Sequence, residues 1–454
     1  MRIAHAIRAN APRKIPAAAG NQVMARNTIA TLLLVAFSAM SADWSHWRGP
    51  GRDGVSTESS GWDKGLRLPN RELWSAQFGD GASAPLVVGG VLYTMGWKNG
   101  QDTVYAVNAA TGKVIWKQSY RCGKYGRHAT GDQHMYKGAT ATPEFDAATG
   151  FLYTLSTDGH LNCWNTRQAG KNVWGGNFYN LFKIPRRPQV TKKRGTRRDY
   201  GYTAAPLVFG DWMLMEVGST KHGNVIAFDK RTGRTVWASQ NKDPAGHTGG
   251  LAPMTVEGVP CVTVLTALNL VVTRLDGANA GKEVARHPWV TDFINNIATP
   301  AVAGNRVIVT SRYNVQSAAL LEISLRKGAR EVWRIREASG VCSPVIFENH
   351  FYWANKGLYC FDLASGKRRW MGGRYSDAGS CLVTADGRLL IWANSGDLSL
   401  TETAKRSPSK VTILQEKRGV FRGMAWPHVV LADGRIYVRD ISGAMKCFAL
   451  RAGP

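Results

Sequence analysis

The chain has 454 residues, which is long enough for two or three average domains or for one large array of repeated units. Hydrophobic residues make up 44% of it, with 49 Gly and 16 Trp, so a disordered chain is excluded and a turn-rich β protein is favoured. The seven cysteines are dispersed without a Cys-x-x-Cys pair, so neither a zinc site nor a redox motif is indicated. An isolated disulfide stays open, but its pairing cannot be assigned from the sequence.

Residues 1–42 have the composition of a leader and signal peptide. Arg26 precedes an apolar run over 29–37, and small residues follow at 38–42, which is typical of a secretory signal. The run is too short for a stable membrane anchor, and no cysteine stands near the expected cleavage site for lipid attachment. We therefore predict a periplasmic or secreted protein that starts at Met1 or Met24 and has no transmembrane segment after cleavage. A transit peptide or an uncleaved anchor is the alternative.

An N-terminal arm is expected over residues 43–70. It contains Trp44 and Trp47 beside a Gly-Pro-Gly turn, which suggests an extended segment held against a folded body. The run 71–75 then looks like the second half of a hairpin that recurs later in the chain. It ends on Trp74 and lacks a first half.

That hairpin is first complete at 106–116, where the sequence reads Ala-Val-Asn-Ala-Ala-Thr-Gly-Lys-Val-Ile-Trp, and it returns at 227–237 and 360–370. In each copy an apolar run reaches Asn or Asp, a Thr-Gly or Ser-Gly turns the chain, and a second run ends on Trp. The Asn or Asp side chain can accept hydrogen bonds from backbone N–H groups two residues on, and Gly takes the positive φ of the turn.

A second marker, small residues followed by Pro, opens an apolar strand in seven places, and Ser380-Cys381-Leu382 fills the one gap in their spacing. The resulting eight units, each with four predicted strands, follow one another at intervals of 38 to 63 residues. This pattern predicts an all-β fold, an eight-bladed β-propeller of four-stranded antiparallel blades over residues 71–450. The last unit lacks its fourth strand, so the N-terminal strand at Trp74 is expected to complete it and close the ring.

The pattern Ala-x-Asp-x-x-Thr-Gly-x-x-x-Trp resembles the tryptophan-docking motif of the quinoprotein-type, or pyrroloquinoline quinone (PQQ)-like, propeller family. The arm sequences 47–50 and 52–56 look like the N-terminal signature of exported PQQ-like propellers common in planctomycete and verrucomicrobial genomes. The resemblance covers residues 43–450. It implies that the Trp of one blade packs on the turn of the next. The docking residues would be Trp74, Trp116, Trp174, Trp237, Trp333 and Trp370.

Two inter-blade loops are long, and both are expected on one face beside the central channel, where function is most often placed. The loop 122–138 carries His128, Asp132 and His134, whose spacing does not bring metal ligands together, so no metal site is predicted. The loop 182–200 is either a solvated segment or an anion-binding patch. Its eight basic residues are Lys183, Arg186, Arg187, Lys192, Lys193, Arg194, Arg197 and Arg198.

Other residues just before the Pro-initiated strands should reach the same face of the channel. Together with the His-Asp-His loop they are the candidates for binding. They are Tyr200, His247, Asp292, Asn295, Asn296, Arg336, Asp377 and Arg422.

The resemblance leaves two functions open, because the family includes quinoprotein dehydrogenases and the non-catalytic propeller lipoprotein of the outer-membrane protein assembly machine. We expect an exported, monomeric, non-catalytic scaffold of the cell envelope that binds a protein or an anionic glycan, with no catalytic residue and no cofactor. The alternative is a PQQ-dependent sugar or alcohol dehydrogenase, with Asp292, Asn295 and Asn296 contributing to a Ca²⁺ cage. The adjacent cysteine pair of alcohol-oxidising members and a Cys-x-x-Cys-His motif are absent.

The charge agrees with an anionic partner. The formal net charge is +26 for the whole chain. The first 42 residues hold five of the 58 Lys and Arg and none of the 32 Asp and Glu, which leaves +21 on the rest. Export makes nucleic acid an unsuitable partner, so the anionic polysaccharide or envelope protein is preferred.

Overall fold

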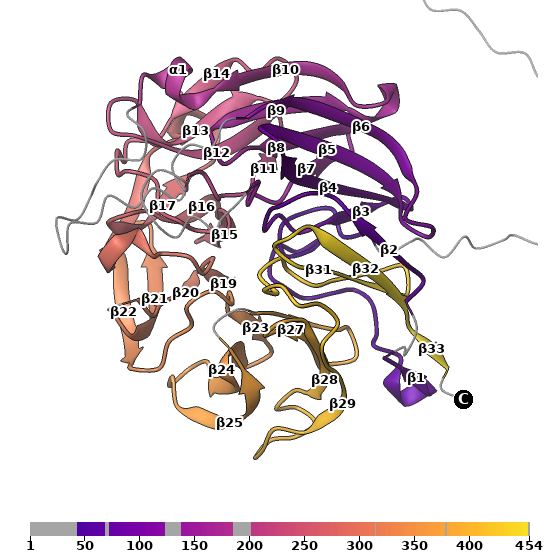
Figure 1. Ribbon diagram of the computed structural model, residues 1–454. Helices are drawn as coiled ribbons and strands as arrows, with labels where there is room; N and C mark the ends of the chain where they lie inside the picture. Colours follow the sequence, from indigo (N-terminus) through magenta and orange to yellow (C-terminus); the bar gives the residue numbers. More distant parts are fainter. Residues whose placement is uncertain are drawn as a thin grey trace, which may run out of the picture. The chain divides into compact units, whose positions relative to one another are not determined.

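The computed structural model describes residues 43–68, 72–122, 138–184, 201–313, 315–376 and 379–452. These residues belong to one compact unit, in which eight β-sheets stand side by side around a common centre (Figure 1). The predicted eight-bladed β-propeller of four-stranded antiparallel sheets is confirmed. No helix within the described ranges is long and apolar enough to cross a membrane.

Blades 1 to 4 each consist of four strands in chain order, from the channel outward. Blade 1 has β3 (Leu86–Val88), β4 (Val91–Lys98), β5 (Gln101–Asn108) and β6 (Val114–Arg121). Blade 2 has β7 (Glu144–Asp146), β8 (Phe151–Leu155), β9 (His160–Asn165) and β10 (Lys171–Asn177). Blade 3 has β11 (Leu207–Phe209), β12 (Trp212–Ser219), β13 (Gly223–Asp229) and β14 (Thr235–Ala238). Blade 4 has β15 (Ala252–Val256), β16 (Val259–Leu265), β17 (Asn269–Arg274) and β18 (Glu283–Pro288).

Blades 5 to 7 repeat the pattern. Blade 5 has β19 (Ala301–Ala303), β20 (Arg306–Ser311), β21 (Ser317–Ser324) and β22 (Gly328–Ile335). Blade 6 has β23 (Val345–Phe347), β24 (His350–Asp362) and β25 (Arg368–Tyr375). Blade 7 has β26 (Gly379–Val383), β27 (Arg388–Ala393), β28 (Asp397–Glu402) and β29 (Ile413–Lys417).

Strand β24 of blade 6 contains two strands of the usual blade. Ten residues of extended chain would span about 33 Å. The rings of Phe351 and Phe361, however, stack with their centroids 4.8 Å apart. The chain therefore reverses within β24, and Lys356, with φ of 64°, lies at the reversal. Blade 6 thus follows the same plan as the others.

Blade 8 closes the ring with strands from both ends of the chain. It contains β30 (Val430–Ala432), β31 (Arg435–Arg439) and β32 (Ala444–Ala449), and its outer strand is β2 (Trp74–Gln77). Trp74 pairs with Cys447 in an antiparallel register. Figure 1 shows the indigo β2 beside the yellow β32. A further short pair, β1 (Leu66–Arg67) with β33 (Arg451–Ala452), again joins the two ends.

The short helices lie in connections between strands. They are η1 (Trp62–Lys64), η2 (Thr166–Gln168), α1 (Phe178–Phe182), η4 (Gly277–Asn279) and η5 (Asp292–Ile294). The second and third strands of a blade, such as β12 and β13, are buried along almost their whole length. They are apolar on both sides because each blade packs between two neighbours, which forms the core of the ring.

A Trp on the outer strand of six blades lies against the turn of the next blade. The Nε1 of Trp74 donates to the carbonyl of Ala109 at 2.9 Å, and its ring covers Gly112, where a Cβ would come within 2.7 Å of it. Trp333 repeats this with Leu363 at 3.0 Å and Gly366. The other four contacts are Trp116 with Gly170, Trp174 with Gly233, Trp237 with Gly281 and Trp370 with the carbonyl of Ser407.

Candidate functional site

The two faces of the disc carry different connections, which follows from the order of the strands. The tight turns between the first and second strands and between the third and fourth strands lie on one side, which we call the turn face. The inter-blade loops and the connections between second and third strands lie on the other side, which we call the loop face. Both long loops predicted from the sequence belong to the loop face, although residues 123–137 and 185–200 lie outside the described ranges.

The N-terminal arm lies inside the channel, against the inner strands. Trp44 forms a bridge with Val87 of blade 1, with N···O distances of 2.7 and 3.0 Å. Farther along, the arm runs beside Val383 of blade 7, whose carbonyl accepts from Ser56 N at 2.8 Å. The arm therefore crosses the channel from blade 1 to blade 7. It was expected only as a segment held against the folded body, so its place in the channel is a finding of the structure.

A buried carboxylate holds the middle of the arm. Glu144, the first residue of β7, is fully buried and accepts from both terminal nitrogens of Arg52, from His46 Nδ1 at 3.0 Å and from Val208 N at 3.0 Å. Burial alone would raise the pKa of Glu144, but Arg52 and His46 outweigh that effect and the pKa lies below its ordinary value. Glu144 therefore stays ionised and links the arm to blades 2 and 3.

Two further arm residues reach the opposite wall. Trp47 Nε1 donates to Thr299 Oγ1 at 3.0 Å, and its ring lies against Gly249 and Gly250 of blade 4. The Arg48 side chain is buried and donates to the carbonyl oxygens of Asp53 and Pro344. The small residues at 249–250 are needed because a Cβ at either would lie within 2.8 Å of the indole.

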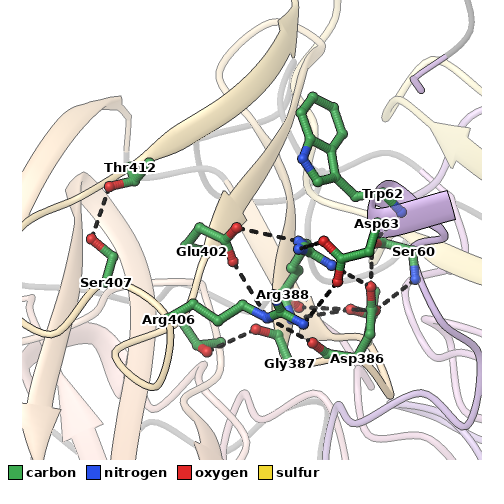
Figure 2. Close-up of polar contacts among 12 residues, drawn as sticks. Ser60, Trp62, Asp63, Asp386, Gly387, Arg388, Glu402, Arg406, Ser407 and Thr412 are labelled. Carbon is green, nitrogen blue, oxygen red and sulfur yellow. Dashed lines mark hydrogen bonds and ion pairs between the residues drawn. The ribbon is translucent and has the colours of Figure 1, made fainter. Parts of the chain in front are cut away.

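The end of the arm is anchored on the turn face of blade 7, as Figure 2 shows. Ser60 donates to Asp386 through its N and Oγ, at 2.7 and 2.6 Å. Asp63 accepts from Arg388 at 2.6 Å and from Arg406 at 3.0 Å. Every charged group in this cluster has a partner within it, so the cluster is an anchor for the arm rather than a binding site.

Above the arm, a cavity of about 90 Å³ remains at the loop-face end of the channel. All eight blades contribute to its wall, and Trp47 forms part of its floor. Among the described residues that line it there is no Asp, Glu, Lys or Arg. The lining residues are aromatic (Trp47, Tyr313, Trp426), imidazole (His247, His428), hydroxyl (Thr140, Thr203, Ser343, Ser380) or small and aliphatic (Ala82, Gly249, Ile297, Val341, Gly379, Ile441).

His428 is the most enclosed titratable group of this wall. Burial lowers its pKa to about 4, and its Nδ1 lies 2.7 Å from the carbonyl of Val429. Its ring packs near Trp44 and Trp47, at centroid distances of 6.0 and 5.6 Å. The imidazole is therefore neutral at neutral pH and is held by the arm, which makes it a weak base.

A basic pocket lies on the loop face between blades 5 and 6. It has a volume of about 510 Å³ and is formed by the connections after β20, after β22 and within β24. Its cationic residues are Arg312, Arg336 and Lys356, and its single carboxylate, Glu337, already pairs with Arg368 at 3.4 Å. The remaining polar and aromatic groups are Gln316, Asn355 and Tyr359. This arrangement can bind an anionic group beside a flat ring or sugar face.

A comparison with known families now places the fold. The sequence profile described as "Outer membrane protein assembly factor BamB" matches residues 68–136 and 101–371, which together exceed half of the chain. The chain belongs to the PQQ-like β-propeller family.

Curated relatives of this PQQ-like propeller include subunits of quinone alcohol dehydrogenases. It is 32% identical over 174 residues to the dehydrogenase subunit of a quinone alcohol dehydrogenase from Komagataeibacter europaeus, covering 36% of this chain and 21% of that protein. The corresponding subunit from Gluconobacter oxydans is 31% identical over 159 residues, covering 34% of this chain and 18% of that protein. The chain thus spans about a fifth of the length of these curated relatives.

Solved structures share the fold at low identity. BamB from Moraxella catarrhalis superposes with a TM-score of 0.56 at 13% identity, covering 85% of this chain and 99% of that one. The C-terminal WD40 domain of Sif2 superposes with a TM-score of 0.55 at 9% identity, covering 84% of this chain and 98% of that one. At such identities the superpositions establish the propeller architecture alone.

The binding candidates predicted from the sequence occupy different environments in this PQQ-like propeller. His247 lines the channel cavity, and Arg422 is exposed. Asn296 is fully buried, and its amide donates to the carbonyls of Thr266 and Trp289 while its oxygen accepts two hydroxyl hydrogen bonds. Its side chain is thus used in holding the loop after β18, which corrects the expectation that it is available to a ligand.

Asp292 and Asn295 precede Asn296 in the same connection. Asp292 is half-buried in η5, and Asn295 is the buried residue that ends η5. No group of three or more His, Cys, Asp and Glu side chains suited to a metal occurs in the part of the chain that the structure describes. The remaining candidates lie outside the described residues. They are His128, Asp132, His134, Tyr200, Asp377 and seven of the eight basic residues of the second loop, all but Lys183.

Sequence reasoning missed Glu144 and, apart from Arg336, the residues of the basic pocket. Glu144 follows Pro143 at a place where most other units continue with an apolar residue, and that departure was the available signal. Arg312 and Lys356 stand in the connections between second and third strands, which were not considered because they are short. Their nearness to Arg336 depends on how blades 5 and 6 pack.

Proposed function

We propose that this PQQ-like propeller is an exported, non-catalytic scaffold of the cell envelope that binds an envelope protein or an anionic polysaccharide through its loop face. The observation that carries the proposal is the chemistry of that face. The channel is crossed by the arm and is uncharged above it, while cationic side chains gather at the loop-face pocket between blades 5 and 6. The net charge of the chain, +26, acts in the same direction.

The similarity to quinone alcohol dehydrogenases supports a PQQ-dependent dehydrogenase as the competing function. The described residues fit that cofactor poorly. PQQ carries carboxylates and acts with Ca²⁺, which needs a cage of oxygen ligands, yet the lining of the cavity has neither cations nor carboxylates. Its volume of about 90 Å³ is also below the roughly 300–1,000 Å³ of sites that hold cofactor-sized ligands. We therefore derive no chemical step through the quinone.

The loop-face assignment is tested by charge neutralisation with a matched control. The triple variant Arg312→Gln, Arg336→Gln, Lys356→Gln removes three charges from the basic pocket. A control, Lys113→Gln, Lys117→Gln, Lys171→Gln, removes three exposed charges from the outer strands and turns of blades 1 and 2. Three ion pairs of about 0.5–1 kcal/mol each correspond to a roughly 10- to 100-fold weaker affinity for polygalacturonate, used as the anionic probe. Equal weakening in both variants would reject a specific loop-face patch.

The second loop is tested by retention of the protein on anionic envelope material. Neutralising Arg186, Arg187, Lys192, Lys193 and Arg194 is expected to weaken retention on anionic envelope material, and unchanged retention would remove this loop from the proposal. Co-purification of the untreated protein with its own envelope identifies whether the partner is a protein.

A further inference from the structure

Two of the seven buried cysteines lie side by side at the junction of blades 6 and 7. Cys342 stands just before β23, and Cys381 lies in β26, so they come from neighbouring inner strands. Their sulfur atoms are 3.7 Å apart, which is van der Waals contact. Among the described residues, which include all seven cysteines, no other pair of sulfur atoms is in contact.

A buried cation from the arm faces this pair. The Arg48 guanidinium is almost fully buried, and its Nε and Nη1 have no hydrogen-bond partner among the described residues. The Ala354 N–H also points to Cys342 Sγ, at 3.4 Å. The adjacent Cys381 thiol, the Ala354 N–H and Arg48 lower the pKa of Cys342, while the pKa of Cys381 is raised.

We propose that Cys342 and Cys381 form a disulfide that joins blades 6 and 7 when the protein matures in an oxidising compartment. The bond requires the sulfur atoms to approach from 3.7 Å to about 2.05 Å, a change that small side-chain rotations can supply. This inference goes beyond the scaffold function and does not depend on what the loop face binds.

The reaction is a thiol–disulfide exchange with a disulfide-bearing oxidant, such as an envelope thiol–disulfide oxidoreductase or oxidised glutathione. Because both sulfur atoms are buried in the finished ring, the exchange takes place during folding, before blades 6 and 7 close over them. The Cys342 thiolate attacks one sulfur of the oxidant and forms a mixed disulfide with it. The other sulfur of the oxidant leaves as a thiolate. Cys381 then loses its proton and attacks the Cys342 sulfur, which releases the second oxidant sulfur. Two electrons and two protons pass from the cysteine pair to the oxidant, which leaves as a dithiol or as two thiols.

The bond would have a structural consequence at the channel wall. It would close a segment of 39 residues between two adjacent inner strands, directly beside Ser343 and Ser380 of the cavity lining. A cross-link at this place opposes separation of two blades at the edge of the channel. The Arg48 side chain of the arm would then cover a disulfide instead of two thiols.

The experiment counts thiols in the full chain purified from an oxidising periplasm. The protein is denatured without reductant, labelled with a maleimide and weighed. We expect five labelled thiols out of seven in the wild type, and a cross-linked peptide that joins Cys342 to Cys381. Cys342→Ser and Cys381→Ser should each show six labelled thiols, because each variant keeps six cysteines and cannot form the disulfide. The control Cys447→Ser, which removes a buried cysteine elsewhere, should show four.

Seven labelled thiols in the wild type would overturn the proposal, as would a cross-linked peptide joining any other pair. If a serine variant does not fold, the peptide map of the wild type alone decides the matter. A second readout is thermal. Reduction of the wild type should lower Tm by about 4 °C, and should leave Tm of Cys381→Ser unchanged. An equal Tm of reduced and oxidised wild type would contradict an inter-blade bond.

Discussion

At the scale of single residues, the propeller is held together by docking Trp side chains, whose indoles pack on the next blade and can donate a hydrogen bond to it. Five of the six docking Trp place their ring on a glycine of the next blade, and Trp370 reaches the carbonyl of Ser407. The Nε1 of four of them donates to a carbonyl oxygen of the next blade; these are Trp74, Trp174, Trp333 and Trp370. A Tyr of the second strand supports the indole, as Tyr352 does for Trp370 at a centroid distance of 5.9 Å. The contact removes apolar area from water and satisfies a buried donor.

Replacing Trp370 with Ala should therefore destabilise the protein by about 3–5 kcal/mol, since a large buried side chain is lost at a blade junction. The matched control is Met371→Ala, because Met371 is the next residue on β25 and is 46% exposed. Urea unfolding followed by tryptophan fluorescence or circular dichroism measures both. A similar loss of stability in the two variants would show that the docking contact of Trp370 contributes no more than an exposed side chain of the same strand.

The residues that could be predicted from the sequence are those whose role repeats with a period. The Trp and Gly of the hairpins recur in register, so their spacing alone indicates which side chain meets which turn. Glu144 and Arg52 do not recur at equivalent places in other blades. They are 92 residues apart, and no periodic pattern connects them. The sequence does not tell an Asn side chain that is available to a ligand from one that is used inside the protein. The four hydrogen bonds of Asn296 in the structure show that its side chain is of the second kind.

At the scale of elements, the arm is the feature that separates this propeller from a simple ring. It runs along the channel wall, forms backbone bridges to blades 1 and 7, and is held by ion pairs at Glu144 and Arg388. An extended segment with polar residues can occupy a channel because its hydrogen bonds are completed by the inner strands. The arm thus reduces the channel to a small uncharged cavity on the loop face.

The arm should respond to acid through Glu144. The pKa of Glu144 is lowered in the folded protein, so its ionised form contributes stability that is complete above the unfolded pKa, about 4.3, and is lost as pH falls through the lower folded pKa. Glu144→Gln should cost about 3–5 kcal/mol at pH 7, because Arg52 loses its buried partner, and the cost should shrink below about pH 4.

Urea unfolding of the wild type and of Glu144→Gln at pH 7 and pH 3.5 measures this difference. The control is Glu257→Gln, an exposed carboxylate in a turn of blade 4, which should change stability by less than about 0.5 kcal/mol at both pH values. If Glu144→Gln lowers the free energy of unfolding by the same amount at both pH values, the ionised form of Glu144 does not hold the arm.

At the scale of the whole molecule, the first and last parts of the chain share one blade. Strand β2 supplies the outer strand of blade 8, so the ring cannot close until both ends are present. This closure could be predicted from the sequence. The last repeat unit lacks a fourth strand, and the N-terminal strand at Trp74 belongs to no complete unit, so the second can complete the first. The place of the arm in the channel could not be predicted, since it depends on the shape of a cavity that exists only after the ring has closed.

Removing residues 1–77 should therefore open the ring, whereas removing residues 1–42 should not. The longer truncation loses the arm, β2 and the Trp74 contact, so we expect a lower Tm and faster proteolysis of blade 8. Differential scanning calorimetry and limited proteolysis compare the two. Identical unfolding of the two truncated proteins would mean that β2 contributes little to closure.

The proposed function, a scaffold rather than a quinoprotein enzyme, is tested most directly by one titration. Purified full chain is titrated with PQQ in the presence of Ca²⁺ while the quinone absorbance is followed, and the mixture is then assayed for dye-linked oxidation of alcohols and sugars. The account predicts no saturable change in absorbance and no turnover. Stoichiometric binding of PQQ accompanied by substrate oxidation would contradict it.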